Sequence, residues 1–227
     1  MNKEMERSGL REQLQAQFAR VGKALASPAR LEILHLLSQG EKPVEHIARM
    51  AGLTVANASQ HLQQLKSVRM VTSRKTGQQV RYSLAALTVA SLINHLHEFG
   101  NERLLEVQEL VTTHLTPLNG QPPVAPEDAA RMIGQGQTIP VDIRPKDEYQ
   151  SGHLPGAVSV PFEDLEKHLS HLSREKSLLV YAHDIYSEKA YQAVHRFREA
   201  GFNAFRMDGG VADWMLAGQS VVSQTQA

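Results

Sequence analysis

Residues 27–84 read SPARLEILHLLSQGEKPVEHIARMAGLTVANASQHLQQLKSVRMVTSRKTGQQVRYSL, and this stretch decides the fold of the first half of the chain. The serine and proline at its start predict an N-cap and a first-turn proline, so a helix is expected from there to Gly40. A short helix, PVEHIARMA, stops at Gly52, and Thr54 is placed to cap the next one, VANASQHLQQLKSV. Two short helices joined by the turn AGLT form a helix-turn-helix.

A β-hairpin is expected directly after these helices. In MVTSRKTGQQVRYSL, residues 70–84, two strand-like runs flank Lys75, Thr76 and Gly77, a turn able to supply a positive φ angle. A helix-turn-helix followed by a basic hairpin is a winged helix. The major groove of DNA admits one helix whose polar side chains reach base edges, while basic residues of the wing contact phosphates.

Two further amphipathic helices flank this module. The first is predicted from apolar residues at helical spacing, and the last from about Leu87 to Val111. Together they carry more apolar surface than a small domain can cover, so we expect pairing with a second subunit. The apolar residues are Leu10, Leu14, Phe18, Val21 and Leu25 in the first helix, and Val89, Leu92, Ile93, Leu96 and Phe99 in the last.

Charge is distributed unevenly along a chain whose net charge is zero. Residues 1–120 carry 14 Lys and Arg against 10 Asp and Glu, and residues 121–227 carry 10 against 14. Between His46 and His97 there are six basic residues and no acidic one, which favours a surface that faces phosphates over a chance run on a solvated face. The predicted DNA-binding residues are Thr54, Asn57, Ser59, Gln60, His61, Gln64, Arg74, Lys75 and Arg81, with a purely structural role left open for His61.

The chain has no cysteine, which excludes disulfides, thiolate metal sites and cysteine nucleophiles. His95 and His97 point about 200° apart on a helix, so no metal site and no cofactor is expected. No run of 18 apolar residues occurs and the first residues are charged and polar. We therefore expect a soluble, cytoplasmic protein with no membrane contact.

A proline-rich segment divides the chain. We predict a DNA-binding and dimerisation domain over residues 1–115, a stiff linker over 116–126 and a second domain over 127–227. After the linker, apolar runs such as IPVDI and SLLVYA alternate with helical stretches such as SEKAYQAVHRFREAG, a pattern typical of an α/β domain with a parallel sheet. The fold class is thus a mainly α winged helix-turn-helix domain plus an α/β domain.

The first domain resembles the ArsR family of bacterial winged-helix repressors over about residues 10–100. The resemblance rests on SPARLEIL, on the turn into SQHLQQL and on a wing that ends in RYSL. It implies a homodimer that sits on an imperfect palindrome of double-stranded DNA and leaves it when an effector binds. Family members sense metals through cysteines in the third helix or through ligands in the last helix, but here the third helix reads PVEHIARMA.

The second domain resembles the rhodanese family over about residues 126–218, through VDIRPKDEYQSGHLPGAVSVP, VYAHDIYSEKAYQAVHRFREAGF and MDGGVADW. Such domains transfer sulfur through a cysteine at the first position of the active loop, which is Ala182 here. A methyl group cannot take up sulfur, so no catalytic residue is assigned. The resemblance places Asp142, Arg144, His153 and Trp214 in the framework around a vestigial loop made of Ala182, His183, Asp184, Ile185, Tyr186 and Ser187.

These observations predict a DNA-binding transcriptional repressor whose catalytically inactive rhodanese-like domain acts as a sensor, a dimer brace or a docking module. A loop between a buried strand and a helix N-terminus favours an anion, so a small anionic or sulfur-containing effector is expected. One alternative is a sulfurtransferase-regulator in which the catalytic cysteine at position 182 is replaced by alanine in this chain. Another is an interaction adaptor with no specific DNA affinity.

Overall fold

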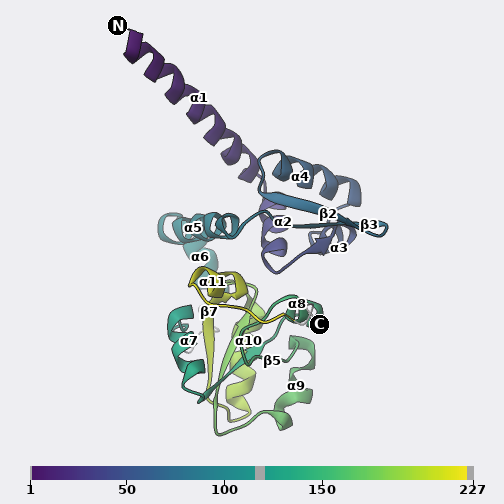
Figure 1. The fold of residues 1–227 in the computed structure, drawn as a ribbon. Helices are drawn as coiled ribbons and strands as arrows, with labels where there is room; N and C mark the ends of the chain where they lie inside the picture. Colours follow the sequence, from purple (N-terminus) through teal and green to yellow (C-terminus); the bar gives the residue numbers. More distant parts are fainter. Residues whose placement is uncertain (1, 116–120, 224–227) are drawn as a thin grey trace. The chain divides into compact units, whose positions relative to one another are not determined.

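The computed structural model describes residues 2–115 and 121–223 (Figure 1). The chain forms two compact units, residues 1–90 and residues 91–227. The boundary between the two units follows Ala90 in the sequence, whereas the sequence analysis predicted a linker between the domains at residues 116–126. The two positions differ because residues 91–115 group with the second unit. Residues 116–120 of the expected linker lie outside the described residues.

The first unit contains the predicted helix-turn-helix and hairpin. A three-stranded antiparallel sheet has the order β1-β3-β2, and the two-residue strand β1 was not predicted from the sequence. Figure 1 shows α1 extending away from the other helices of this unit. The elements are α1 (Asn2–Leu25), α2 (Pro28–Ser38), β1 (Lys42–Pro43), α3 (Val44–Met50), α4 (Val55–Ser67), β2 (Val71–Thr76) and β3 (Gln79–Leu84).

Local signals in the sequence account for several of these element ends. The hydroxyl of Thr54 accepts a hydrogen bond from the Asn57 backbone N–H at 3.2 Å, as expected for the cap of α4. Gly77 has a φ of 61° at the hairpin turn. The expected cap of α2 is wrong in one respect, because the Ser27 side chain makes no capping hydrogen bond. Its backbone carbonyl accepts the first helical hydrogen bonds instead.

The expected single helix over residues 87–111 is two helices. α5 (Leu87–Arg103) ends before Leu104, whose backbone is extended, and α6 (Leu105–His114) follows. A helix that ends leaves its last carbonyl groups without intrahelical donors. The Gln108 side chain donates to the carbonyls of Asn101 and Glu102, at 2.9 and 3.3 Å, and this satisfies them at the break.

The second unit is built on the parallel sheet that the sequence predicted. The strand order is β5-β4-β6-β7, and all three pairings are parallel. Figure 1 shows helices on both sides of this sheet. The elements are α7 (Pro126–Gly134), β4 (Thr138–Asp142), α8 (Lys146–Ser151), β5 (Val158–Ser159), α9 (Leu165–His168), β6 (Ser177–Ala182), α10 (Glu188–Glu199), β7 (Ala204–Gly210) and α11 (Val211–Leu216).

Both faces of this sheet are buried, each by its own apolar cluster. On one face Val180 packs with Leu165 of α9 and Phe197 of α10. On the other face Leu179 packs with Ala129 of α7 and Trp214 of α11. Strands buried on both faces read as continuous apolar runs, which explains the sequence SLLVYA of β6.

Within the two described ranges, no helix combines the length and the apolar character that crossing a bilayer requires.

Candidate functional site

The fourth helix presents a polar face to solvent. Its buried positions are Ala58, Leu62 and Leu65, which leaves the opposite side of the helix exposed. Among the predicted DNA-binding residues, Thr54, Asn57, Gln60 and Gln64 are exposed, while Ser59 and His61 are half-buried. The Nδ1 atom of His61 is buried and finds no hydrogen-bond partner among the described residues.

Gln64, one of the predicted DNA-binding residues, already has a hydrogen-bond partner within the chain. The Gln64 side-chain oxygen accepts a hydrogen bond from the Arg30 guanidinium at 2.5 Å. Arg30 also donates to the backbone carbonyls of Lys23 and Ala24 at the end of α1. Gln64 therefore has a structural contact in addition to its exposed position.

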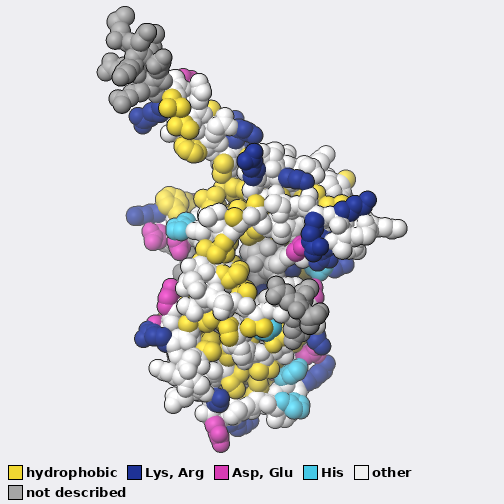
Figure 2. Space-filling model, in the orientation of Figure 1, with side chains coloured by type: hydrophobic (Ala, Val, Ile, Leu, Met, Phe, Trp, Pro, Cys, Tyr) yellow, Lys and Arg dark blue, Asp and Glu magenta, His cyan; other side chains and the backbone are white. Residues whose placement is uncertain are grey.

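The hairpin carries the predicted basic residues, but Glu41, which lies outside the hairpin, forms ion pairs with two of them. Glu41 accepts from Arg74 Nε at 2.8 Å and from Arg81 Nε at 2.7 Å. The Arg81 guanidinium also donates to the Glu41 backbone carbonyl at 3.1 Å. Lys75 is exposed at the far end of β2. Figure 2 shows the resulting surface, where dark blue side chains gather at the hairpin.

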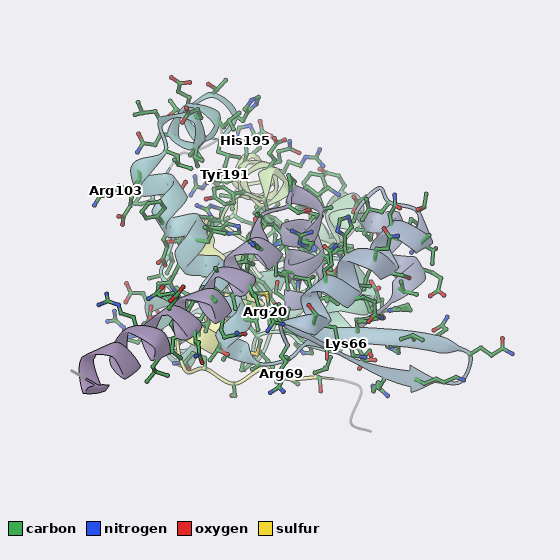
Figure 3. All side chains as sticks on the ribbon, turned by 90° about the horizontal axis from the view of Figure 1, so that it is seen from above. Arg20, Lys66, Arg69, Arg103, Tyr191 and His195 are labelled. Carbon is green, nitrogen blue, oxygen red and sulfur yellow. The ribbon has the colours of Figure 1, made fainter. Side chains whose placement is uncertain are left out.

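Three further residues of this surface are not among the predicted DNA-binding residues, although two of them belong to the basic stretch that the sequence analysis expected to face phosphates. Gln63 lies on the exposed side of α4, one residue before Gln64, and donates to the Tyr82 hydroxyl at 3.4 Å. Lys66 and Arg69 follow at the end of the helix, where Figure 3 labels them, and both are exposed. Lys66 Nζ donates to Ser73 of the wing at 2.7 Å. The helical spacing of Gln60 and Gln63 and the basic stretch itself were the signals that could have identified them.

Apolar side chains lie exposed on two helices, as expected for surfaces that a second chain could cover. On α1, Leu10 and Phe18 are 59% and 62% exposed, and Figure 2 shows hydrophobic side chains along that helix. On α5 the expectation holds for Leu92, Leu96 and Phe99, which are exposed. It is wrong for Val89 and Ile93, which are buried in the chain itself.

The vestigial loop starts at the carboxyl end of β6, where the sequence placed it. Ala182 is buried. The backbone carbonyls of Ala182 and His183 leave no room for a side chain at Gly210, because a Cβ there would lie 2.3 Å from the His183 oxygen. His183 Nε2 lies 2.8 Å from Glu148 Oε2, and Glu148 is buried. The Asp184 carboxylate accepts from the Tyr186 backbone N–H at 2.9 Å.

The contact at Asp184 limits what the loop can bind. A backbone N–H at the N-terminus of a helix is a donor for anions. In this loop the N–H of Tyr186 is taken by a carboxylate of the loop itself. Ser187 precedes α10 without a side-chain capping bond, and its carbonyl accepts from the Ala190 N–H at 2.9 Å. The loop contains no cysteine, so it has no thiol that could carry sulfur.

The framework around the loop is a buried ion pair and its neighbours. Asp142 and Arg144 are 0% and 1% exposed, and the guanidinium meets the carboxylate at 2.6 Å. Burial opposes the charge on Arg144, but the hydrogen bond and charge of Asp142 outweigh it and hold the pKa of the guanidinium above its usual value. Trp214 Nε1 donates to the Ser220 carbonyl, and His153 Nδ1 lies 2.7 Å from the Tyr149 carbonyl.

The two histidines considered as metal ligands have other contacts. His95 Nδ1 lies 2.7 Å from the Ser91 carbonyl, one turn earlier on α5. The His97 ring meets the Tyr186 ring edge-on at 5.7 Å between centroids. Within the described residues no three His, Asp or Glu side chains gather as metal ligands would.

Comparison with known proteins gives two family matches. Residues 27–73 match the bacterial regulatory protein arsR family, and residues 125–217 match the rhodanese-like domain family. The HTH-type transcriptional regulator Rv0324 of Mycobacterium tuberculosis is 38% identical over 211 residues, which cover 90% of this chain and 90% of that protein. The HTH-type transcriptional regulator CmtR of Mycobacterium bovis is 38% identical over 85 residues, 37% of this chain and 72% of its own length.

A solved structure is also similar to the first half of the chain. It is the homodimeric winged helix-turn-helix DNA-binding domain of Mb0332 from Mycobacterium bovis, with 44% identity and a TM-score of 0.39. The match covers 41% of this chain and 86% of that one. From the relative that matches nearly the full length and from the two family matches, it follows that this chain belongs to the arsR family of HTH-type transcriptional regulators and carries a rhodanese-like domain.

Proposed function

We propose that this protein is a DNA-binding transcriptional repressor, which acts as a homodimer and whose rhodanese-like domain senses a small effector without transferring sulfur. The observation that carries the proposal is the exposed polar face of α4, followed directly by a basic hairpin. The printed names of its relatives, HTH-type transcriptional regulators, support the same assignment.

In this proposal α4 enters the major groove. The amide side chains of Asn57, Gln60 and Gln63 reach base edges, since amides can both donate to and accept from a base. Lys66, Arg69 and Lys75 contact phosphates on either side, and their charge supplies affinity that does not depend on sequence.

The proposed homodimer covers the exposed apolar faces described above. A monomer would leave Leu14 and Phe18 of α1 in water, and also Phe99 of α5. Exposed apolar patches of this kind are typical of interfaces. A C2 dimer presents two α4 helices to two half-sites, so the DNA site would be an imperfect palindrome. Repression is taken from the family resemblance.

The proposed role of the second domain follows from its loop. The methyl group of Ala182 cannot carry sulfur, and the neighbouring His183 is engaged by Glu148. The domain is therefore a sensor, and its effector is a small anionic or sulfur-containing compound. The sulfurtransferase alternative is not favoured, because the relative that matches 90% of the chain is named as a transcriptional regulator.

Fluorescence anisotropy tests the proposal. The full-length protein is titrated onto its own upstream DNA and onto an unrelated duplex, across a salt series. We expect a preference for the upstream DNA that persists near physiological salt. The double variant Gln60→Ala/Gln63→Ala should lose about tenfold or more of that preference, because each good base contact is worth about 1–3 kcal/mol.

A matched control removes two exposed glutamine side chains from the second unit, in the double variant Gln135→Ala/Gln137→Ala. It should bind both duplexes as the unaltered protein does. Equal and steeply salt-dependent binding of the unaltered protein to both duplexes would contradict the proposal and favour an interaction adaptor.

A further inference from the structure

A pocket of about 330 Å³ lies within the second compact unit. One wall is formed by α5 and α6, and the other by the vestigial loop, α10 and β7. Figure 3 labels Tyr191, which comes from α10. The polar side chains of its lining include Asn101, Gln108, Tyr186, Tyr191, Arg206 and Asp208.

Arg206 is a buried cation that has no counter-ion among the described residues. It lies on β7 and is 8% exposed, and its guanidinium carbon stands 4.3 Å from the centroid of the Tyr191 ring. Its Nη1 atom donates only to the carbonyl of Met207, at 3.3 Å, and its Nε atom is buried and has no hydrogen-bond partner among the described residues. Within those residues it forms no ion pair with a carboxylate. A buried charge without a partner is costly, so this wall of the pocket fits an anionic group.

Both walls supply neutral hydrogen-bonding groups. The side chain of Asn101 hydrogen-bonds Tyr186, and burial raises the pKa of the Tyr186 hydroxyl, which therefore stays protonated at neutral pH. Gln108 uses its amide nitrogen on the end of α5. Its amide oxygen is a further acceptor on the wall formed by α5 and α6.

Asp208 sets the charge that the pocket accepts. It lies on the same strand as Arg206, two residues later, and it also lines the pocket. With one carboxylate and one guanidinium among its lining residues, the pocket disfavours a ligand with two negative charges. The remaining lining includes the apolar side chains of Val111, Leu115 and Ile185, which contact a hydrocarbon part and not a bare inorganic ion.

We propose that this pocket binds a small organic monoanion, whose carboxylate or sulfonate group meets Arg206 and whose apolar part packs against α6 and the loop. The pocket connects the segment α5–α6 to the loop that in active relatives of this domain would carry sulfur. That the ligand acts as an effector rests on the function proposed above, whereas its binding does not.

Isothermal titration calorimetry of the full-length protein with sodium benzoate tests the proposal in the absence of DNA, so its outcome is independent of DNA binding. We expect saturable binding at one site per chain, and weaker binding of inorganic phosphate, which has no apolar part and carries more charge. Arg206→Met keeps the side-chain length and removes the charge, and it should weaken benzoate binding about tenfold or more.

Arg196→Met is the matched control, because Arg196 lies exposed on α10 and does not line the pocket. It should bind benzoate as the unaltered protein does. Asp208→Asn provides a second variant in case Arg206→Met does not fold, as judged by circular dichroism. It should bind benzoate several-fold more tightly, because it removes the like charge.

Three results would each overturn the proposal. The first is the absence of saturable benzoate binding by the unaltered protein. The second is equal benzoate affinity in folded Arg206→Met and the unaltered protein, or, where that variant is unfolded, no change in Asp208→Asn. The third is phosphate binding as tight as benzoate binding, which would identify a site for inorganic anions.

Discussion

Replacing Glu41 by glutamine is expected to strengthen DNA binding, because Glu41 engages two arginines of the wing. Its carboxylate oxygens lie 2.8 Å from Arg74 Nε and 2.7 Å from Arg81 Nε. The two arginine side chains are 65% and 30% exposed. A neutral amide holds a guanidinium less strongly than a carboxylate does, so both arginines become available to phosphates.

The size of the effect follows from counter-ion release. Each phosphate contact steepens the slope of log K against log salt by about 0.9. Between about 1 M salt and physiological salt, one such contact corresponds to roughly fivefold in affinity, and two correspond to roughly thirtyfold. The partly exposed ion pairs that are lost stabilise the fold by only about 0.2–1 kcal/mol each, so the variant should remain folded.

Fluorescence anisotropy on the upstream DNA, from about 50 mM to about 200 mM salt, measures both quantities. Glu45→Gln is the control, since Glu45 is exposed on α3 and the substitution changes the net charge equally. The reasoning is refuted if Glu41→Gln binds no more tightly than Glu45→Gln with the same slope. That result would mean that Glu41 holds the arginines in the position in which they meet DNA.

Three further outcomes are expected. Asp142→Ala should destabilise the second unit by about 3–5 kcal/mol in urea unfolding, because it leaves the buried guanidinium of Arg144 unpaired; an unchanged midpoint would mean that water or another group replaces the carboxylate. Phe18→Glu should shift the protein towards monomers in analytical ultracentrifugation and weaken DNA binding in parallel, and a dimer of unaltered affinity would exclude α1 from the interface. Burial raises the pKa of Asp213 above its ordinary 3.8, so the folded protein binds this proton more tightly than the unfolded chain does. As the pH rises above about 3.8, the free energy of unfolding of the unaltered protein should therefore fall relative to that of the Asp213→Asn variant. A difference between the two proteins that does not depend on pH would contradict the shift.

Much of the fold could be predicted from local patterns in the sequence. Apolar spacing identified the helices, the run SLLVYA identified a strand buried on both faces, and Thr54 marked the start of α4. Each of these signals acts over a few residues, since it reflects helix capping or the burial of one face. The two domains and their fold classes follow from such signals.

Contacts between distant residues could not be predicted in the same way. Glu41 meets Arg74 and Arg81 across 33 and 40 residues, and no spacing rule connects them. The stretch without acidic residues therefore suggested a wing more positive than it is. The end of α5 before Leu104 was missed for a related reason, because the carbonyls it frees are satisfied by Gln108 from the following helix.

The sequence also did not show which polar side chains of α4 are exposed. Polarity alone selected Ser59 and His61, which are half-buried, and omitted Gln63, which is exposed. The direction of each side chain depends on which residues face the core, and here Ala58 marks that side.

Arg30 has a consequence for the spacing of a DNA site. Its guanidinium joins the carbonyls of Lys23 and Ala24, at the end of α1, to Gln64 on α4. If two chains pair along α1, a shift in the register of that pairing is passed to both α4 helices through these bonds. The separation of the half-sites is then set by the packing of α1, and a DNA site lengthened by one base pair must either bend or break the bonds of Arg30.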